Sequence, residues 1–251
     1  MAAVIELRHV DKAFGSHVVY QNMSLTIEEG ETLTVIGGSG QGKSVCLKLM
    51  IGLLLADEGD VLFRGQEVSG LGHEGLRDLR RKVAMVFQGG ALFDSMNIRE
   101  NVGYALTEHT KMSDDEITRR AWECLGMVGL GQDRSILERM PSSLSGGMRK
   151  RVAIARSIAL QPEVILYDEP TTGLDPSNIR RIGAMIRKLQ GELGVTSIVV
   201  THDMPTAFSV SNRIAMLYDR NFPYVGTPDS FKQSEVPEVR NFVQGRIADG
   251  A

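Results

Sequence analysis

One eight-residue stretch, Gly37-Gly38-Ser39-Gly40-Gln41-Gly42-Lys43-Ser44, constrains the fold of this chain more than any other feature. It follows an apolar run, Thr32–Ile36, and precedes a segment from Lys43 to about Leu53 that has helical spacing. The stretch fits G-x-x-x-x-G-K-[ST], the phosphate-binding loop found between a strand and a helix. A glycine-rich turn that matches by chance is the alternative, and the flanking strand and helix disfavour it. The sequence therefore predicts an α/β core with a P-loop.

The residue types in this loop suit a bound triphosphate. Glycines permit backbone conformations in which successive N–H groups face an anion. The helix start behind the loop adds unpaired N–H groups and the positive end of its dipole. Lys43 is expected to contact the β- and γ-phosphates, and the Ser44 hydroxyl to bind Mg²⁺. The predicted ligands are therefore ATP and Mg²⁺.

Short strands surround the loop segment at the N-terminal end of the chain. Val4–Val10, Val18–Tyr20 and Ser24–Ile27 read as strands, and Gly59–Phe63 with Gln66–Val68 reads as a hairpin around Arg64-Gly65. These segments predict an antiparallel β subdomain beside the nucleotide-binding core.

The pattern changes to helix between about residues 89 and 158. Asn97–Leu106 has helical spacing, Ser113 opens a capping box, and a further helix is expected over Met148–Leu160. We therefore predict one domain over residues 1–251, with a helical subdomain at about 89–158 inserted in the core. The remaining expected elements are strands at Lys82–Phe87, Val164–Tyr167 and Thr196–Val200, a helix at Ser177–Leu193, a hairpin of Arg213–Tyr218 with Tyr224–Val225, and one or two short helices in Asp229–Ile247.

Polar residues follow each predicted buried strand, where ligands bind in parallel α/β sheets. Asp168 is placed to hold Mg²⁺, and Glu169 to orient and deprotonate the attacking water. Gln88 would contact Mg²⁺ or the water, and His202 the γ-phosphate and the glutamate. Taken singly, Asp168-Glu169 is explained equally well as an acidic strand exit, and His202 is explained better as a satisfied core histidine. Their shared position at strand ends favours one catalytic site.

A second segment, Leu144-Ser145-Gly146-Gly147, places two glycines and a serine at a helix start. Such a start is a second anion-binding terminus, and its alternative is a flexible loop with a serine N-cap. The basic residues that follow, Arg149, Lys150, Arg151 and Arg156, are expected to form a solvated basic face.

Composition excludes several classes of function. The 251-residue chain has a net charge of −3, which does not indicate a nucleic-acid partner. Cys46 and Cys124 lie far apart in apolar contexts and are expected to be buried packing residues. The N-terminal residues lack the pattern of a signal peptide, and no apolar run approaches the length of a membrane span. A soluble chain with at most a peripheral membrane role is expected.

These motifs, in this order, resemble the ATPase subunit of ABC transporters. Gly37–Ser44 is similar to the Walker A motif of that family, Val164–Glu169 to Walker B, Gln88 to the Q-loop and Leu144–Gly147 to the signature motif. Gly173-Leu174-Asp175 is similar to the D-loop, and His202 to the switch histidine. Phe14 matches the aromatic residue that stacks on adenine, with an edge-strand core residue as its alternative. The resemblance extends from Phe14 to the hairpin beyond His202 and implies an ABC-type P-loop NTPase fold.

The resemblance also implies a mechanism. Two copies would pack head to tail as a homodimer, and each ATP would lie between the Walker A loop of one copy and Ser145–Gly147 of the other. Gly89–Tyr104 would receive the coupling helices of a membrane permease. Glu169, His202 and Gln88 would be catalytic, and Ser44, Gln88 and Asp168 would bind Mg²⁺. Nucleotide contacts are expected from Phe14, Gly37, Gly38, Ser39, Gly40, Gln41, Gly42, Lys43, Ser44, Val45, Ser145, Gly146, Gly147 and Asp175.

Two segments narrow the resemblance to one branch. Gln88–Asn97 and Leu144–Arg151 are similar to the phospholipid-transport (Mla-type) ATPases that serve MCE-domain systems, and Met148 stands where most of the family has glutamine. Arg240–Gly245 also resembles this branch. The implied partners are a multi-spanning permease, an MCE-domain lipid-binding protein and a small STAS-like regulator, at the cytoplasmic face of the inner membrane. The implied cargo is phospholipid moved between inner and outer membranes.

Two other functions stay open at this point. An ABC ATPase for another cargo, such as amino acids or lipoproteins, would share every catalytic motif. A soluble ABC ATPase acting on nucleic acid is disfavoured, because such proteins usually carry two nucleotide domains, a coiled-coil insertion or a basic face.

Overall fold

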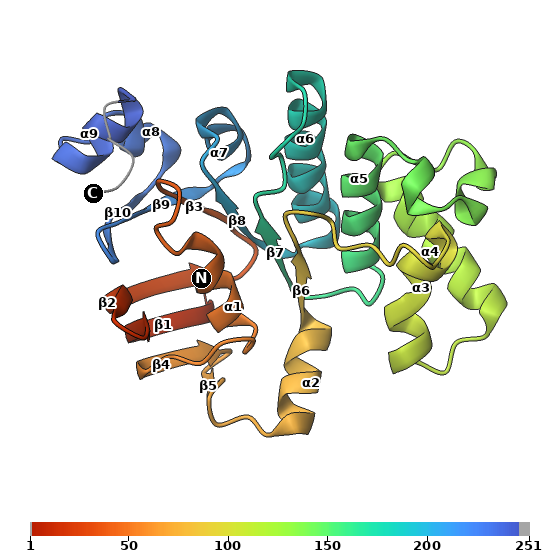
Figure 1. Cartoon of the computed structure of the whole chain (residues 1–251), viewed down its shortest axis with the longest axis horizontal. Coiled ribbons are helices and arrows are strands. Elements are labelled where there is room, and N and C mark those ends of the chain that lie inside the picture. The colour runs from red at the N-terminus through yellow and green to blue at the C-terminus, as the bar shows by residue number, and fades with distance from the viewer. Residues whose placement is uncertain (1, 246–251) are drawn as a thin grey trace.

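The computed structural model describes residues 2–245, which form two β-sheets with helices between and around them (Figure 1). The first sheet is antiparallel, in the order β2-β1-β4-β5, and the second has the order β10-β9-β3-β8-β7-β6 with every strand parallel except β10. The strands of the first sheet are β1 (Ala3–Phe14), β2 (His17–Glu28), β4 (Glu58–Phe63) and β5 (Gln66–Glu67). Those of the second are β3 (Thr32–Ile36), β6 (Val83–Val86), β7 (Val164–Asp168), β8 (Thr196–Thr201), β9 (Arg213–Tyr218) and β10 (Asn221–Gly226).

The helix after the phosphate loop, α1 (Lys43–Met50), contributes to the core between the two sheets. Val164 and Leu166 of β7 belong to this core, whereas Ile165 and Tyr167 face the helices on the other side. Because both faces of β7 are covered, the strand reads as one continuous apolar run rather than as an alternating one.

A helical layer lies on the opposite side (Figure 1). It contains α3 (Ile98–His109), α4 (Asp114–Met127), α5 (Gly146–Ser157) and α6 (Pro176–Leu193), which share one apolar core. In this layer α5 and α6 lie next to the sheet, and α3 and α4 pack on α5. Capping boxes at Asn97 and Ser113 start α3 and α4, and short 3₁₀ turns at Arg134–Glu138 and Pro141–Ser143 lead into α5. The α/β class, the antiparallel sheet and the helical stretch are confirmed, while the subdomain boundaries at about 89 and 158 stay a prediction.

Several expected elements differ in extent. Val18–Tyr20 and Ser24–Ile27 are parts of a single strand, β2, which continues through the polar pair Gln21-Asn22 with Asn22 at φ +52°. Two helices were not predicted, α2 (His73–Lys82) and α7 (Met204–Val210). Leu79 alone is buried in α2, so its apolar periodicity is too weak to detect in the sequence, and α7 is only seven residues long.

The C-terminal segment forms α8 (Pro228–Lys232) and α9 (Pro237–Val243), as expected for Asp229–Ile247 as far as the structure describes it. Phe231 and Val239 are fully buried in a third small core against β3 and β9. Both cysteines are buried, and burial raises the pKa of the Cys46 thiol to about 12 and that of Cys124 to about 11. Within residues 2–245, no helix combines the length and apolar character needed to cross a membrane.

Candidate active site

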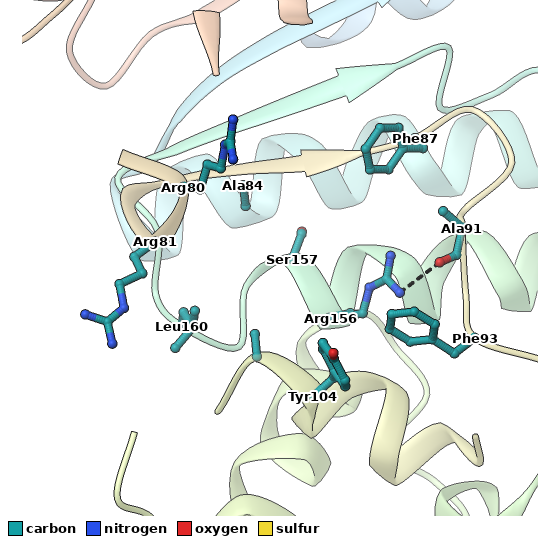
Figure 2. Close-up of a pocket in the computed structure, with 11 residues that line it drawn as sticks. Arg80, Arg81, Ala84, Phe87, Ala91, Phe93, Tyr104, Arg156, Ser157 and Leu160 are labelled. Carbon is teal, nitrogen blue, oxygen red and sulfur yellow. Dashed lines mark hydrogen bonds between the residues drawn. The ribbon is translucent and has the colours of Figure 1, made fainter. Parts of the chain in front are cut away.

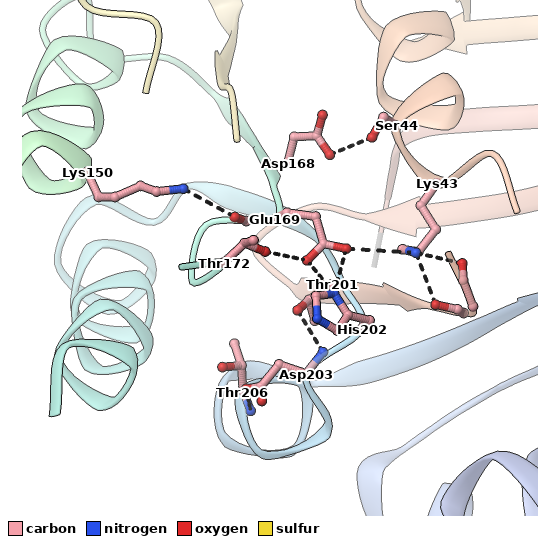
Figure 3. Close-up of polar contacts among 12 residues, drawn as sticks. Lys43, Ser44, Lys150, Asp168, Glu169, Thr172, Thr201, His202, Asp203 and Thr206 are labelled. Carbon is pink, nitrogen blue, oxygen red and sulfur yellow. Dashed lines mark hydrogen bonds and ion pairs between the residues drawn. The ribbon is translucent and has the colours of Figure 1, made fainter. Parts of the chain in front are cut away.

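Four neighbouring strands end in the polar residues that the sequence singles out. β3, β8, β7 and β6 lie side by side and run parallel. Their carboxyl ends lead into the phosphate loop, His202, Asp168-Glu169 and Gln88 respectively. Figure 3 shows Lys43, Glu169 and His202 converging on one space. The fold therefore brings together residues from the phosphate loop to His202, far apart in the sequence, through parallel pairing alone.

Glycine is required at two positions of the loop for different reasons. Gly42 caps α1 with φ +94°, and a Cβ there would lie 2.5 Å from the Val19 side chain. A Cβ on Gly37 would lie 2.5 Å from the carbonyl oxygen of Leu217. At the far end of the loop the Val45 N–H donates to the Gly42 carbonyl at 2.7 Å. The loop therefore combines a left-handed turn with a close approach to β9 that only glycine accommodates.

The Lys43 ammonium lies inside the loop. Its Nζ donates to the carbonyl oxygens of Gly37 at 3.0 Å and Gly38 at 2.8 Å, and lies 3.8 Å from Glu169 Oε1. Burial lowers the pKa of Lys43, whereas attraction to Glu169 and Asp168 opposes that shift. A buried cation held by two carbonyls and near a carboxylate is placed to receive anionic phosphate oxygens.

Ser44 and Asp168 place a hydroxyl and a carboxylate side by side next to the phosphate loop. Ser44 Oγ donates to Asp168 Oδ1 at 2.7 Å, and Asp168 is 7 % exposed. Mg²⁺ is typically bound through one or two carboxylates together with substrate phosphates. A hydroxyl and a carboxylate beside a phosphate loop fit that ion.

Glu169 is held from several directions. Its backbone has φ +47°, an uncommon conformation for glutamate and one that tends to persist at functional sites. His202 Nδ1 lies 2.9 Å from Oε2, and Thr172 Oγ1 donates to Oε2 at 3.1 Å. Sequence reasoning missed Thr172, because a threonine four residues after the end of β7 carries no motif of its own. The carboxylate is fixed at the strand end with an imidazole beside it.

The predicted solvated basic face is wrong for three of its four residues, and only Arg149 is exposed. Lys150 is buried, and its Nζ donates to the carbonyl oxygen of Gln88. Arg149, Arg151 and Arg156 donate to the carbonyls of Leu144, Gly129 and Ala91 at 3.0, 3.2 and 2.9 Å. Backbone carbonyls at loop ends need donors, and the long cationic side chains of α5 reach them.

The second predicted anion site faces outward. Ser145 caps α5 by accepting the Met148 N–H at 3.3 Å, and both Ser145 and Gly146 are exposed. In Figure 1 the start of α5 is separated from α1 by the central sheet. Within one chain, this helix start and the phosphate loop therefore do not meet.

Asp175 connects to that helix start through a residue that the sequence did not indicate. Its carboxylate caps α6, and Asn178 Nδ2 donates to Oδ2 at 2.5 Å. A Cβ on Gly147 would lie 2.8 Å from Asn178 Oδ1. Asp175, Asn178 and Gly147 therefore form one contact chain between two motifs.

Phe14 ends β1 with 47 % of its surface exposed, which contradicts the alternative of a core residue.

An apolar groove of about 390 Å³ lies beside the segment that follows Gln88 (Figure 2). Phe93 and Tyr104 pack with ring centroids 4.8 Å apart, and the Arg156 guanidinium lies 5.6 Å from the Phe93 ring centroid. Phe87 and Leu160 complete its apolar lining.

Comparison with known proteins gives consistent matches. The family model described as ABC transporter matches residues 20–172. The Escherichia coli intermembrane phospholipid transport system ATP-binding protein MlaF is 37% identical over 250 residues, covering 100% of this chain and 91% of that protein. The probable ribonucleotide transport ATP-binding protein mkl of Mycobacterium tuberculosis is 37% identical, covering 98% of this chain and 68% of that protein.

A solved structure shares the fold. The dimeric structure of MJ0796, a bacterial ABC transporter cassette, matches with a TM-score of 0.82 at 34% sequence identity. The match covers 89% of this chain and 98% of the other.

Proposed function

The chain belongs to the ABC transporter family as an ATPase subunit, and we propose that two copies of it enclose two ATP molecules and power phospholipid transport. The observation that carries the proposal is the split of the anion-binding elements. The phosphate loop leads into α1, whereas the exposed Ser145-Gly146 starts α5, which lies apart from α1 in Figure 1. A second copy would supply the missing helix start to each ATP.

The catalytic roles follow from the contacts. The ammonium of Lys43 would exchange the Gly37 and Gly38 carbonyls for phosphate oxygens. Glu169 would accept a proton from the attacking water, a role worth roughly 10²–10⁴-fold in rate. His202, in contact with the Glu169 carboxylate, would fix its direction and contact the γ-phosphate. Mg²⁺, held by Ser44, Asp168 and Gln88, would supply charge neutralisation at the phosphates when bound.

Remaining nucleotide contacts would come from both copies. Phe14 is exposed at the end of β1 and would stack on adenine. Ser145, Gly146 and Gly147 of the partner copy would contact the γ-phosphate, with Asp175 at the dimer interface. The dimeric MJ0796 cassette, 34% identical, supports this arrangement.

The apolar groove would receive a coupling helix of a membrane permease. It includes Ala91, Phe93 and Tyr104 from the predicted contact segment Gly89–Tyr104, and Phe93 and Tyr104 are both partly exposed. A permease bound there would place the subunit at the cytoplasmic face of the inner membrane. An MCE-domain lipid-binding protein and a STAS-like regulator would complete the assembly. Nucleic acid is not among the proposed partners.

Phospholipid is the proposed cargo because the E. coli relative named for intermembrane phospholipid transport matches over the whole chain. A second cargo class is open because relatives named for probable ribonucleotide transport are equally identical, at 37%. Purification with the bound permease and lipid analysis of the complex tests the choice. Phospholipid recovered with an MCE-domain protein supports the proposal, whereas a permease that binds ribonucleotide, amino acid or lipoprotein contradicts it.

A further inference from the structure

Lys150 is a buried cation between the helical layer and the catalytic strand ends. It lies on the second turn of α5 and is 8 % exposed. Its Nζ donates to the carbonyl oxygen of Gln88. It also donates, at 3.4 Å, to the carbonyl oxygen of Glu169 (Figure 3). One side chain therefore joins α5 to the ends of β6 and β7.

The surroundings of this ammonium are unusual. Burial lowers the pKa of Lys150, and attraction to Glu169 and Asp168 opposes the shift. Among residues 2–245 no carboxylate oxygen lies within 4.0 Å of it. A buried charge bonded to carbonyls alone is costly for stability, so simple packing would be served better by an apolar side chain of similar length.

The Glu169 carbonyl is a sensitive point for such a contact. With φ +47°, Glu169 directs its carbonyl toward α5, where it accepts from Lys150 and, at 3.3 Å, from the Thr172 N–H. The same residue carries the carboxylate that faces Lys43 and His202. A contact at this carbonyl therefore fixes the backbone of the same residue that carries the catalytic carboxylate.

We propose that Lys150 is a positioning residue that couples the two ATP sites through α5. The proposal rests on the proposed function. Ser145–Gly147, at the start of α5, would bind the ATP held by the partner copy, and Lys150 one turn later holds Glu169 and Gln88 of its own site. Engagement of the partner's nucleotide moves the helix start and, through Lys150, sets the catalytic carboxylate of the other site.

The test replaces Lys150 with methionine, which keeps the chain length and removes the donor. In Lys150→Met the Kd for ATP stays within about twofold, kcat falls by about 10- to 100-fold, and the Hill coefficient for ATP falls toward one. Lys150→Arg recovers part of both values. The matched control is Arg151→Met, which removes the neighbouring cation and its bond to the Gly129 carbonyl, and it keeps wild-type kcat and Hill coefficient.

Wild-type kcat and Hill coefficient in Lys150→Met would overturn the coupling role of Lys150. The proposed function would still stand in that case if Glu169→Gln arrests turnover. If the methionine variant does not fold by circular dichroism, Lys150→Gln is measured in its place. Glutamine is shorter than lysine and carries no charge, so a reduced Hill coefficient supports the proposal and a wild-type one overturns it. Absence of ATP hydrolysis in the wild-type chain would remove the proposed function and the inference together.

Discussion

The imidazole of His202 lies directly against the carboxylate of Glu169, with Nδ1 2.9 Å from Oε2 and 3.1 Å from Oε1. Glu169 is also 3.8 Å from the Lys43 ammonium, so the carboxylate lies between a histidine and a lysine. This geometry suits a general base whose direction is fixed before the substrate arrives.

Glu169→Gln is therefore expected to bind ATP with near wild-type affinity and to lose turnover by about 10²-fold or more. The amide keeps the shape and the contact to His202 but cannot accept the proton. Steady-state phosphate release and equilibrium ATP binding are the measurements. Turnover within threefold of wild type would remove Glu169 from this role.

Tyr20 is expected to support the phosphate loop from β2. Its fully buried hydroxyl donates to the Gly42 carbonyl at 2.5 Å, and burial raises the pKa of the phenol, so it stays a donor. Tyr20→Phe should raise the Kd for ATP by about 2- to 10-fold, since one neutral hydrogen bond is lost. The matched control is Tyr224→Phe, which removes a 2.6 Å contact to Ser230 in the C-terminal core and leaves the Kd unchanged. Equal Kd values in the two variants would contradict the support role.

Gly147 is expected to tolerate no side chain, unlike its neighbour Gly146. A Cβ on Gly147 would lie 2.8 Å from Asn178 Oδ1, whereas one on Gly146 has Leu174 at 3.9 Å as its nearest neighbour. Gly147→Ala should lower the free energy of unfolding by about 1–3 kcal/mol through overpacking. Gly146→Ala should be neutral or stabilising, because alanine favours helix. Urea titration measures both, and equal stability of the two variants would contradict the Asn178 contact.

Asp175 gives a pH-dependent contribution to stability. Hydrogen bonds to the Asp175 carboxylate hold its pKa below the usual 3.8. The largest effect comes from the backbone N–H of Asn178, followed by the Asn178 side chain and the Ser177 N–H. A lowered folded-state pKa stabilises the protein fully above the unfolded-state value, and this contribution is lost as pH falls through the folded value. Asp175→Ala should therefore lower the urea midpoint at neutral pH, and the gap to wild type should close below about pH 3.8. A gap that does not change with pH would contradict an ionised cap.

The sequence alone predicts those parts of the site in which a single motif specifies both the local fold and the chemistry. The loop at Gly37–Ser44 and the acidic pair after β7 lie as predicted, because a strand, a turn and a helix follow each other without long-range help. Lys150 and Asn178 could not be identified in this way. Lys150 acts through the carbonyls of Gln88 and Glu169, and Asn178 acts through Gly147. Each of these contacts joins residues at least 19 positions apart and leaves no pattern in the sequence.

The antiparallel sheet and α2 illustrate the same limit for the fold. The polar pair Gln21-Asn22 interrupts the alternation of β2. The strand nevertheless continues, because it pairs with β1 on both sides of this pair. In α2 only Leu79 is buried, so the helix is specified by its packing against β6 and not by an apolar stripe.

The most direct measurement is the sedimentation of Glu169→Gln with Mg²⁺-ATP, alone and combined with Ser145→Arg. The single variant should sediment as a species of twice the 27.5 kDa chain mass, and the added arginine should return it to a monomer. A monomer in both cases, or a dimer that ignores the change at Ser145, would contradict an ATP site shared between two copies.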